Sequence, residues 1–73
     1  MELRIIVTGS QTSAIKAKRH LENSGIIAQV VRAPKYAEGC RFGIEILLSE
    51  LPRAISLLGD ARIEYTEIIK SKP

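Results

Sequence analysis

The fold is decided by residues 41–59, which read RFGIEILLSELPRAISLLG. In the first half, apolar residues recur at every second position, which is the period of a β-strand with one buried face. In the second half the period becomes helical, since Leu51, Ala54, Ile55 and Leu58 fall at i, i+3, i+4 and i+7. Ser49 is expected to cap this helix, Pro52 to lie in its first turn and Gly59 to end it. The stretch therefore predicts a strand followed directly by a helix.

The N-terminal part of the chain repeats this order. Residues 3–8, LRIIVT, are short and rich in β-branched side chains, which indicates a first strand. Residues 11–24 then carry small and apolar side chains at helical spacing. Ser10 or Thr12 can cap this helix, and Gly25 supplies the left-handed residue that ends it. A strand followed by a helix is therefore expected here as well.

Two further strands complete the order. Residues 26–31 are predicted to form the second strand, which Pro34 ends because proline cannot donate to a sheet ladder. Residues 63–70 are predicted to form the fourth, although their alternation does not assign faces. Right-handed crossovers then place both helices on one face of a four-stranded antiparallel sheet. We expect a single α+β domain over residues 1–73 with the ferredoxin-like βαββαβ arrangement.

The two-residue period predicts which side chains face the helices. The inward set is Leu3, Ile5, Val7, Ile26, Ala28, Val30, Phe42, Ile44, Ile46 and Leu48. Four aliphatic residues are expected on the opposite face, namely Ile6, Ile27, Val31 and Leu47. Because they would lie on neighbouring strands, they predict a contiguous apolar patch and a homodimer formed through it.

Composition limits the class of protein. Hydrophobic residues make up 45% of the 73 residues and charged residues 26%, a balance typical of a packed globule. No apolar run approaches the roughly 18 residues of a membrane span, and the N-terminal run is too short for a signal peptide. The formal net charge of +3 is only a mild bias toward anionic partners. Cys40 is the only cysteine, which favours a reducing, cytoplasmic compartment.

Several kinds of site find little support. One cysteine and one histidine cannot supply the ligands of a structural zinc, so neither a metal nor a cofactor is expected, and His20 is interpreted as an exposed helix residue. The RNA-recognition motif shares the βαββαβ order, but the only aromatic residue of the third strand, Phe42, is expected to face the core, so nucleic-acid binding is not predicted. The amides of residues 9–13 would suit an anion, although a capping turn explains them equally well.

The remaining constellation is PKYAEGCRFG at residues 34–43. Cys40 follows Gly39 and is accompanied by Lys35 and Arg41, whose positive charges would favour a reactive thiolate. Cys40 would also face the same side of the strand as Phe42, which it precedes by two residues. This position would suit a small buried side chain at the start of a strand. Residue types alone leave both interpretations open.

With this loop, its apolar third strand and its two strand–helix units, nearly the whole chain resembles the small DUF3343 proteins, which are described as selenium/sulfur carrier-like. The resemblance implies that the sulfur of Cys40 holds a persulfide or selenide as cargo, with Lys35 at the family's basic position and Pro34 and Gly39 shaping the loop. The family usually has glycine directly after its cysteine. This chain has Arg41 there and Gly43 two residues further on, so either the charge of Arg41 takes over the role of that glycine or the role is absent.

The leading hypothesis is therefore a cytoplasmic sulfur or selenium carrier, and not an enzyme, that exchanges cargo with a sulfur- or selenium-transfer enzyme. Cys40 would bear the cargo, while Lys35 and Arg41 would stabilise its negative charge. Two alternatives remain open. One is a small-ligand-binding or regulatory module resembling the ACT domain, and the other is a non-catalytic interaction subunit.

Overall fold

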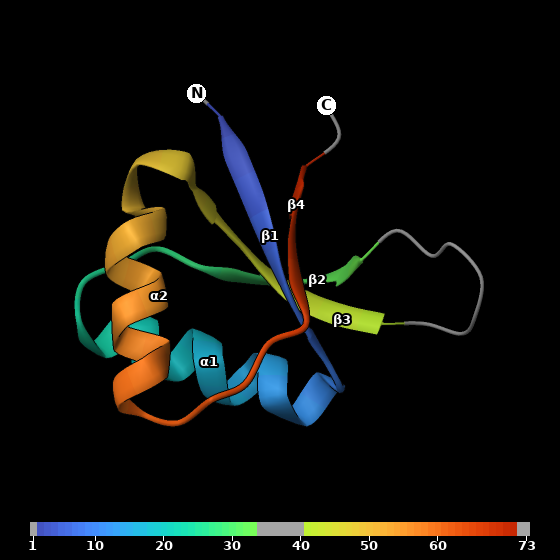
Figure 1. Ribbon diagram of the computed structural model, residues 1–73, viewed down its shortest axis with the longest axis horizontal. Coiled ribbons are helices and arrows are strands. Elements are labelled where there is room, and N and C mark those ends of the chain that lie inside the picture. Colours follow the sequence, from blue (N-terminus) through green and yellow to red (C-terminus); the bar gives the residue numbers. More distant parts are fainter. Residues whose placement is uncertain (1, 34–40, 72–73) are drawn as a thin grey trace.

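The computed structural model describes residues 2–33 and 41–71 (Figure 1). The elements are β1 (Leu3–Gly9), α1 (Gln11–Asn23), β2 (Gln29–Ala33), β3 (Arg41–Leu47), the 3-10 turn η1 (Leu48–Glu50), α2 (Leu51–Asp60) and β4 (Glu67–Lys70). The four strands form one sheet in the order β2-β3-β1-β4, and every neighbouring pair is antiparallel. This confirms the predicted ferredoxin-like βαββαβ fold. Neither helix of this described part reaches the length and hydropathy that crossing a membrane requires.

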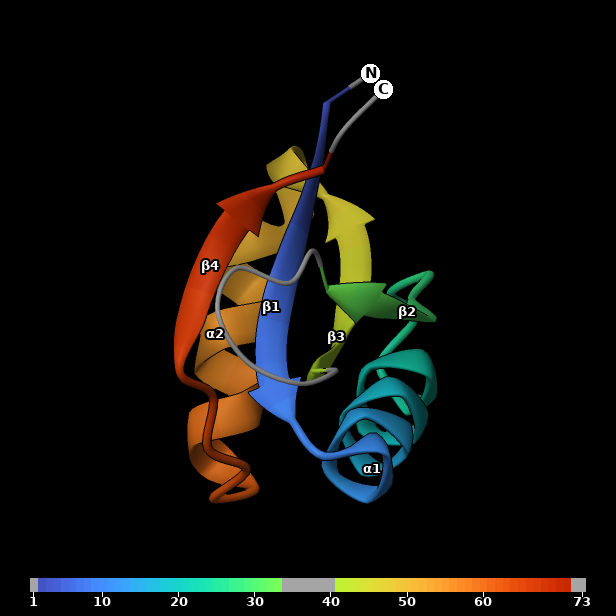
Figure 2. The same ribbon diagram turned by 90° about the vertical axis from the view of Figure 1, so that its right-hand side faces the viewer.

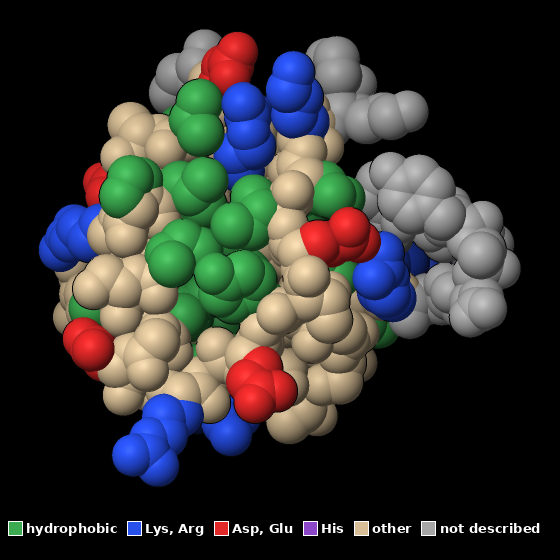
Figure 3. All heavy atoms as spheres, viewed as in Figure 1, with side chains coloured by type: hydrophobic (Ala, Val, Ile, Leu, Met, Phe, Trp, Pro, Cys, Tyr) green, Lys and Arg blue, Asp and Glu red, His purple; other side chains and the backbone are tan. Residues whose placement is uncertain are grey.

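Both helices cover the same face of the sheet, and the main core lies between them and the strands. Figure 2 shows α2 running behind β4 and β1. The fully buried residues of this core are Ile6, Ala17, Leu21, Ile26, Ala28, Ile44, Ile46, Ala54 and Leu58. The predicted inward positions Ile44 and Ile46 of β3, and Ile26 and Ala28 before β2, are therefore confirmed. Hydrophobic side chains of the helical side also reach the surface, where they gather between α2 and the strands β1 and β4 (Figure 3).

The predicted face of β1 is wrong by one residue. Ile6 belongs to the helix-side core, whereas Ile5 and Val7 are buried on the other face of the sheet, here called the open face. The pairing register explains this placement, because Ile6 lies opposite Ile44, which faces the helices. β1 is a central strand between β3 and β4, and it has buried apolar residues on both faces, Ile6 on the helix side and Ile5 and Val7 on the open face.

The apolar patch predicted for self-association is divided in the structure. Ile6 is completely buried beneath the helices, so it cannot join an outer surface. Val31 packs with the open-face cluster, and Leu47 lies opposite Leu3 at the far end of β1. Ile27 is 79% exposed, as expected for an outward residue. The homodimer itself stays a prediction, which sedimentation equilibrium would test.

The ends of α1 are those that the sequence predicts. The Ser10 hydroxyl oxygen caps the helix by accepting a hydrogen bond from the Ser13 amide at 3.1 Å. At the other end Gly25 has a φ of 87°. The Gly25 amide donates to the Glu22 carbonyl, and the following amide donates to the Leu21 carbonyl, which together form a Schellman motif.

The ends of α2 differ from the prediction. Ser49 lies inside η1, and α2 begins after Glu50 without a side-chain cap. Gly59 does not end the helix, which continues to Asp60. The left-handed position is instead Arg62, with a φ of 59°. Glycine's preference for this conformation misled the prediction, because the turn falls three residues later and accommodates an arginine.

Three strand boundaries also differ from those expected. The second strand begins at Gln29 and not at residue 26, because residues 26–28 connect the end of α1 to the sheet without pairing in it, although Ile26 and Ala28 are buried. The fourth begins at Glu67 and not at residue 63, because residues 63–66 still connect α2 to the sheet. The third ends at Leu47, since Leu48 starts η1. Each difference arises where apolar residues lie in a connection instead of in a ladder.

Candidate functional site

The predicted site falls at the start of β3. Pro34, Lys35, Gly39 and Cys40 lie outside the described residues. The structure does describe the two remaining residues, Arg41 and Gly43, and it places both in β3. The geometry of the candidate site is therefore built from Arg41, the direct chain neighbour of Cys40, and from the side chains that surround it.

Arg41 reaches across the open face of the sheet to Glu67. As the first residue of β3 it lies opposite Ala33 of β2, and its Nη2 atom donates to Oε2 of Glu67 over 2.6 Å. Glu67 is the first residue of β4, so the ion pair spans the intervening strand β1. The two side chains are 33% and 41% exposed. The positive charge next to Cys40 is therefore shared with a carboxylate.

Gly43 allows β3 to approach β1 closely. A Cβ atom at residue 43 would lie 2.6 Å from the carbonyl oxygen of Ile6 and 2.8 Å from Cγ2 of Ile5. Both distances are shorter than a Cβ atom tolerates, so any side chain would push the strands apart. Gly43 also borders the register shift between Val7 and Gly9. In the described structure, Gly43 therefore allows β3 and β1 to pack closely at a position two residues after Arg41.

A second polar bridge crosses β1 on the same face. The Ser71 hydroxyl donates to Oε2 of Glu45, which lies on β3 opposite Ile5. The Ser71 amide also donates to the Leu3 carbonyl at 3.3 Å. Two polar contacts therefore link β3 to the C-terminal segment across β1. The ion pair joins Arg41 to Glu67 at the start of β4, and the second contact joins Glu45 to Ser71 just after its end. Polar groups on the open face therefore cross over β1, whose buried side chains on that face, Ile5 and Val7, are apolar.

Two threonines fasten the strand ends near Arg41. Thr8 Oγ1 donates to the carbonyl of Phe42 at 3.2 Å. The amide and hydroxyl of Thr66 both donate to the Val7 carbonyl, at 2.8 and 3.2 Å. The end of β1 is thus joined to the starts of β3 and β4. These bonds hold in place the two strand ends from which Arg41 and Glu67 project.

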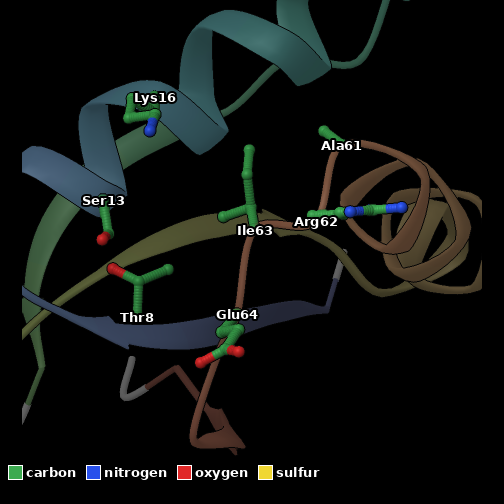
Figure 4. Close-up of a pocket in the computed structure, with 7 residues that line it drawn as sticks. All are labelled: Thr8, Ser13, Lys16, Ala61, Arg62, Ile63 and Glu64. Carbon is green, nitrogen blue, oxygen red and sulfur yellow. The ribbon is translucent and has the colours of Figure 1, made fainter.

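A pocket of about 330 Å³ opens on the helical side of this end of the sheet. It is lined by Thr8, Ser13, Lys16 and residues 61–64, and Figure 4 shows the hydroxyl groups of Thr8 and Ser13 turned toward each other while Arg62 points away. Because the Ser13 amide is already bound by Ser10, the capping interpretation of residues 9–13 is confirmed. Anion binding there stays a prediction.

His20 and Phe42 occupy surroundings that differ from the simplest expectation. His20 is only partly exposed, and its Nε2 atom is buried without a hydrogen-bond partner among the described residues. The Arg32 guanidinium lies 5.8 Å from the centre of the partly buried Phe42 ring. Within residues 2–33 and 41–71, no three histidine, cysteine or acidic side chains gather as metal ligands would.

Glu67 is the functional candidate that sequence reasoning missed. It lies in the segment whose alternation assigned no faces, and it is 26 residues from Arg41 along the chain. The signal that identifies it is the register of β4 on β1, which places Glu67 opposite Val7 of the open-face cluster. Local periodicity contains no information on that register.

Comparison with known proteins identifies one family. Residues 3–70 match the family described as "Putative Se/S carrier protein-like". Searches of curated proteins and of solved structures gave no match. The matched range covers nearly the whole chain, from β1 through β4, and it includes both Cys40 and Arg41. The chain therefore belongs to the Se/S carrier-like protein family.

Proposed function

We propose that this protein carries sulfur or selenium as a group bound covalently to the Cys40 sulfur. The observation that supports the proposal is the family match over residues 3–70, because this range contains the chain's only thiol. A carrier needs one nucleophilic sulfur that can accept and release cargo, and Cys40 is the only residue of the chain with that chemistry. The proposal places the protein in the reducing cytoplasm, where a single cysteine persists as a thiol.

Loading follows the chemistry of thiol–disulfide exchange. The Cys40 thiolate attacks the terminal sulfur of a persulfide on a donor enzyme, and a new S–S bond forms as the donor's S–S bond breaks. The donor cysteine leaves as a thiolate, and Cys40 then bears the persulfide. One sulfur atom is transferred at an unchanged oxidation level, so no additional oxidant or reductant is needed. A selenium atom would follow the same route.

Unloading reverses these roles. Because the chain has only one cysteine, no second thiol of the same chain can displace the cargo as a disulfide. An acceptor thiolate from another protein or a small molecule must attack the terminal sulfur, which releases the Cys40 thiolate. This requirement for external partners at both steps favours a carrier that serves other enzymes over an enzyme with a complete reaction of its own.

Arg41 provides the electrostatic part of the proposal. It is joined to Cys40 by a peptide bond, and its guanidinium remains one-third exposed on the open face. A thiolate, a persulfide and a selenide are all anions near neutral pH, so a nearby cation favours each of them. Lys35, five positions before Cys40 in the sequence, would add a second positive charge.

Incubation with a cysteine desulfurase and free cysteine tests the proposal. The intact protein should gain one sulfur, or about 32 Da, and reducing agent should remove it. Cys40→Ser is the matched control, since it replaces only the sulfur atom. Equal mass gains in the wild type and in Cys40→Ser would overturn the assignment of Cys40 as the carrier.

A further inference from the structure

A second pocket lies between α1 and the connection from α2 to β4, with a volume of about 270 Å³. It adjoins the pocket of Figure 4, with which it shares Lys16, Ala61 and Ile63, and the Ile63 side chain points toward α1 in that view. One wall comes from α1 and the other from the residues that follow α2. This second pocket, here called the α1 groove, is lined by Lys16, Arg19, His20, Asn23, Ala61 and Ile63.

The α1 wall of the groove follows from the helical period. Lys16, Arg19, His20 and Asn23 fall at i, i+3, i+4 and i+7, so they form one stripe along the helix. A different set of small and apolar residues packs α1 against the core. The stripe therefore presents an ammonium, a guanidinium, an imidazole and an amide to the groove, all of which can form hydrogen bonds.

The opposite wall is held in place by the end of α2. Arg62 adopts a left-handed conformation with a φ of 59°, and its amide donates to the Gly59 carbonyl at 3.1 Å. The Ile63 amide then donates to the Leu58 carbonyl at 2.9 Å. The Ile63 side chain packs against the main core. An apolar surface in a fixed position therefore faces the basic stripe of α1.

The two cations of the groove have no carboxylate partner among the residues that the structure describes. Lys18, on another side of α1, forms an ion pair with Glu22 at 2.9 Å, whereas Lys16 and Arg19 form none within this part of the chain. The described acidic residue nearest in the lining is Glu64, which belongs to the adjoining pocket and not to the groove. The positive charges therefore add in the groove and favour an anion.

His20 and Asn23 supply neutral hydrogen-bonding groups beside the two cations. The Nε2 atom of His20 is buried without a hydrogen-bond partner in residues 2–33 and 41–71. A turn of the imidazole toward a ligand would therefore break no hydrogen bond of this nitrogen within that part of the chain. The Asn23 amide adds a donor one turn of the helix further on. The groove thus combines charge with directional contacts.

We propose that the α1 groove binds a short aliphatic dicarboxylate. Side chains three positions apart on a helix are about 5 to 6 Å apart at Cβ, a separation that two carboxylates on a short methylene chain can match. One carboxylate pairs with Lys16 and the other with Arg19, while the methylene groups cover Ile63. Inorganic phosphate has no apolar part for this surface, so an organic acid fits the groove better. Only described residues line the site, so its occupancy can be measured whether or not Cys40 carries sulfur.

Titration with succinate at low ionic strength tests this site. Amide chemical shifts in proton–nitrogen correlation spectra should change in residues 16–23 and 61–63 and saturate as one binding event. Butyrate keeps the chain length but has one carboxylate, so it should bind at least about threefold more weakly. Inorganic phosphate should also bind more weakly. Succinate that shifts neither segment, or butyrate or phosphate that binds as tightly as succinate, would overturn the proposal.

A pair of double variants separates the groove from the net charge of the protein. Lys16→Gln with Arg19→Gln should weaken succinate binding about tenfold, because both carboxylates lose their partners. Both side chains are exposed, so this variant should keep the thermal unfolding midpoint of the wild type. Lys18→Gln with Lys70→Gln is the matched control, since it removes the same charge from outside the groove. It should weaken binding less than about twofold. Equal weakening by the two double variants would mean that succinate responds to net charge alone, and the site would be wrong.

Discussion

Gly43 of β3 approaches Ile6 of β1 so closely that a Cβ atom at residue 43 would lie 2.6 Å from the Ile6 carbonyl oxygen. The same atom would lie 2.8 Å from Cγ2 of Ile5 and 3.1 Å from Cα of Val7. The two central strands, β1 and β3, can therefore pack this closely only because residue 43 has no side chain. Arg41 lies two residues before Gly43 on the same strand, so this close packing also holds the start of β3, where Arg41 lies, against β1.

Gly43→Ala should destabilise the protein by about 1 to 3 kcal/mol, since overpacking forces the backbone of β1 and β3 apart. Gly59→Ala is the matched control. Gly59 lies within α2, and a Cβ atom there meets nothing within 4 Å. That variant should gain about 0.5 to 1 kcal/mol from helix propensity. Urea unfolding measures both free energies, and a Gly43→Ala protein as stable as the wild type would contradict the close packing.

Arg62→Gly should stabilise the protein by about 0.5 to 1 kcal/mol. Arg62 adopts a φ of 59°, a left-handed conformation that costs a residue with a Cβ atom more than it costs glycine. Gly25, with a φ of 87°, occupies the equivalent place after α1. Gly25→Ala should therefore destabilise by about 1 kcal/mol. Thermal unfolding of both variants would show shifts of opposite sign, and shifts of the same sign would contradict this account of the helix ends.

His20→Leu should stabilise the protein by about 1 kcal/mol. The Nε2 atom of His20 is buried and has no hydrogen-bond partner among the described residues, so an apolar side chain removes a desolvated polar atom. Leucine also has the higher helix propensity. Arg19→Leu, at the exposed neighbouring position, is the control and should change stability by no more than about 0.5 kcal/mol. Because arginine and leucine have similar helix propensities, equal stabilisation by both substitutions would contradict the assignment of the gain to the buried Nε2 atom.

The sequence predicts the fold well where one pattern dominates. The period of two in β3 and the i, i+3, i+4, i+7 pattern of α2 each have a single solution, and Gly25 marks the end of α1 correctly. The prediction failed for β1, where Ile5, Ile6 and Val7 are consecutive and all apolar. A central strand covered on both faces has no alternation from which its orientation can be determined.

The candidate site could be predicted only in part, for a related reason. The position of Cys40 next to Arg41 is a local property, so the sequence displays it directly. The partner of Arg41 depends on which residue of β4 lies at the same level of the sheet. That register is set by pairing with β1, and Glu67 becomes visible only when Val7 and Glu67 are seen to be opposite each other. Long-range pairing of this kind leaves no periodic signal.

The most direct test of the carrier function is to locate the added sulfur within the loaded chain. Trypsin cleaves after Lys35 and Arg41, so the only cysteine is released in the peptide of residues 36–41. After incubation with a cysteine desulfurase and cysteine, followed by alkylation, we predict that this peptide carries one additional sulfur, or about 32 Da. A loaded protein whose 36–41 peptide has an unchanged mass would contradict the proposal that Cys40 bears the cargo.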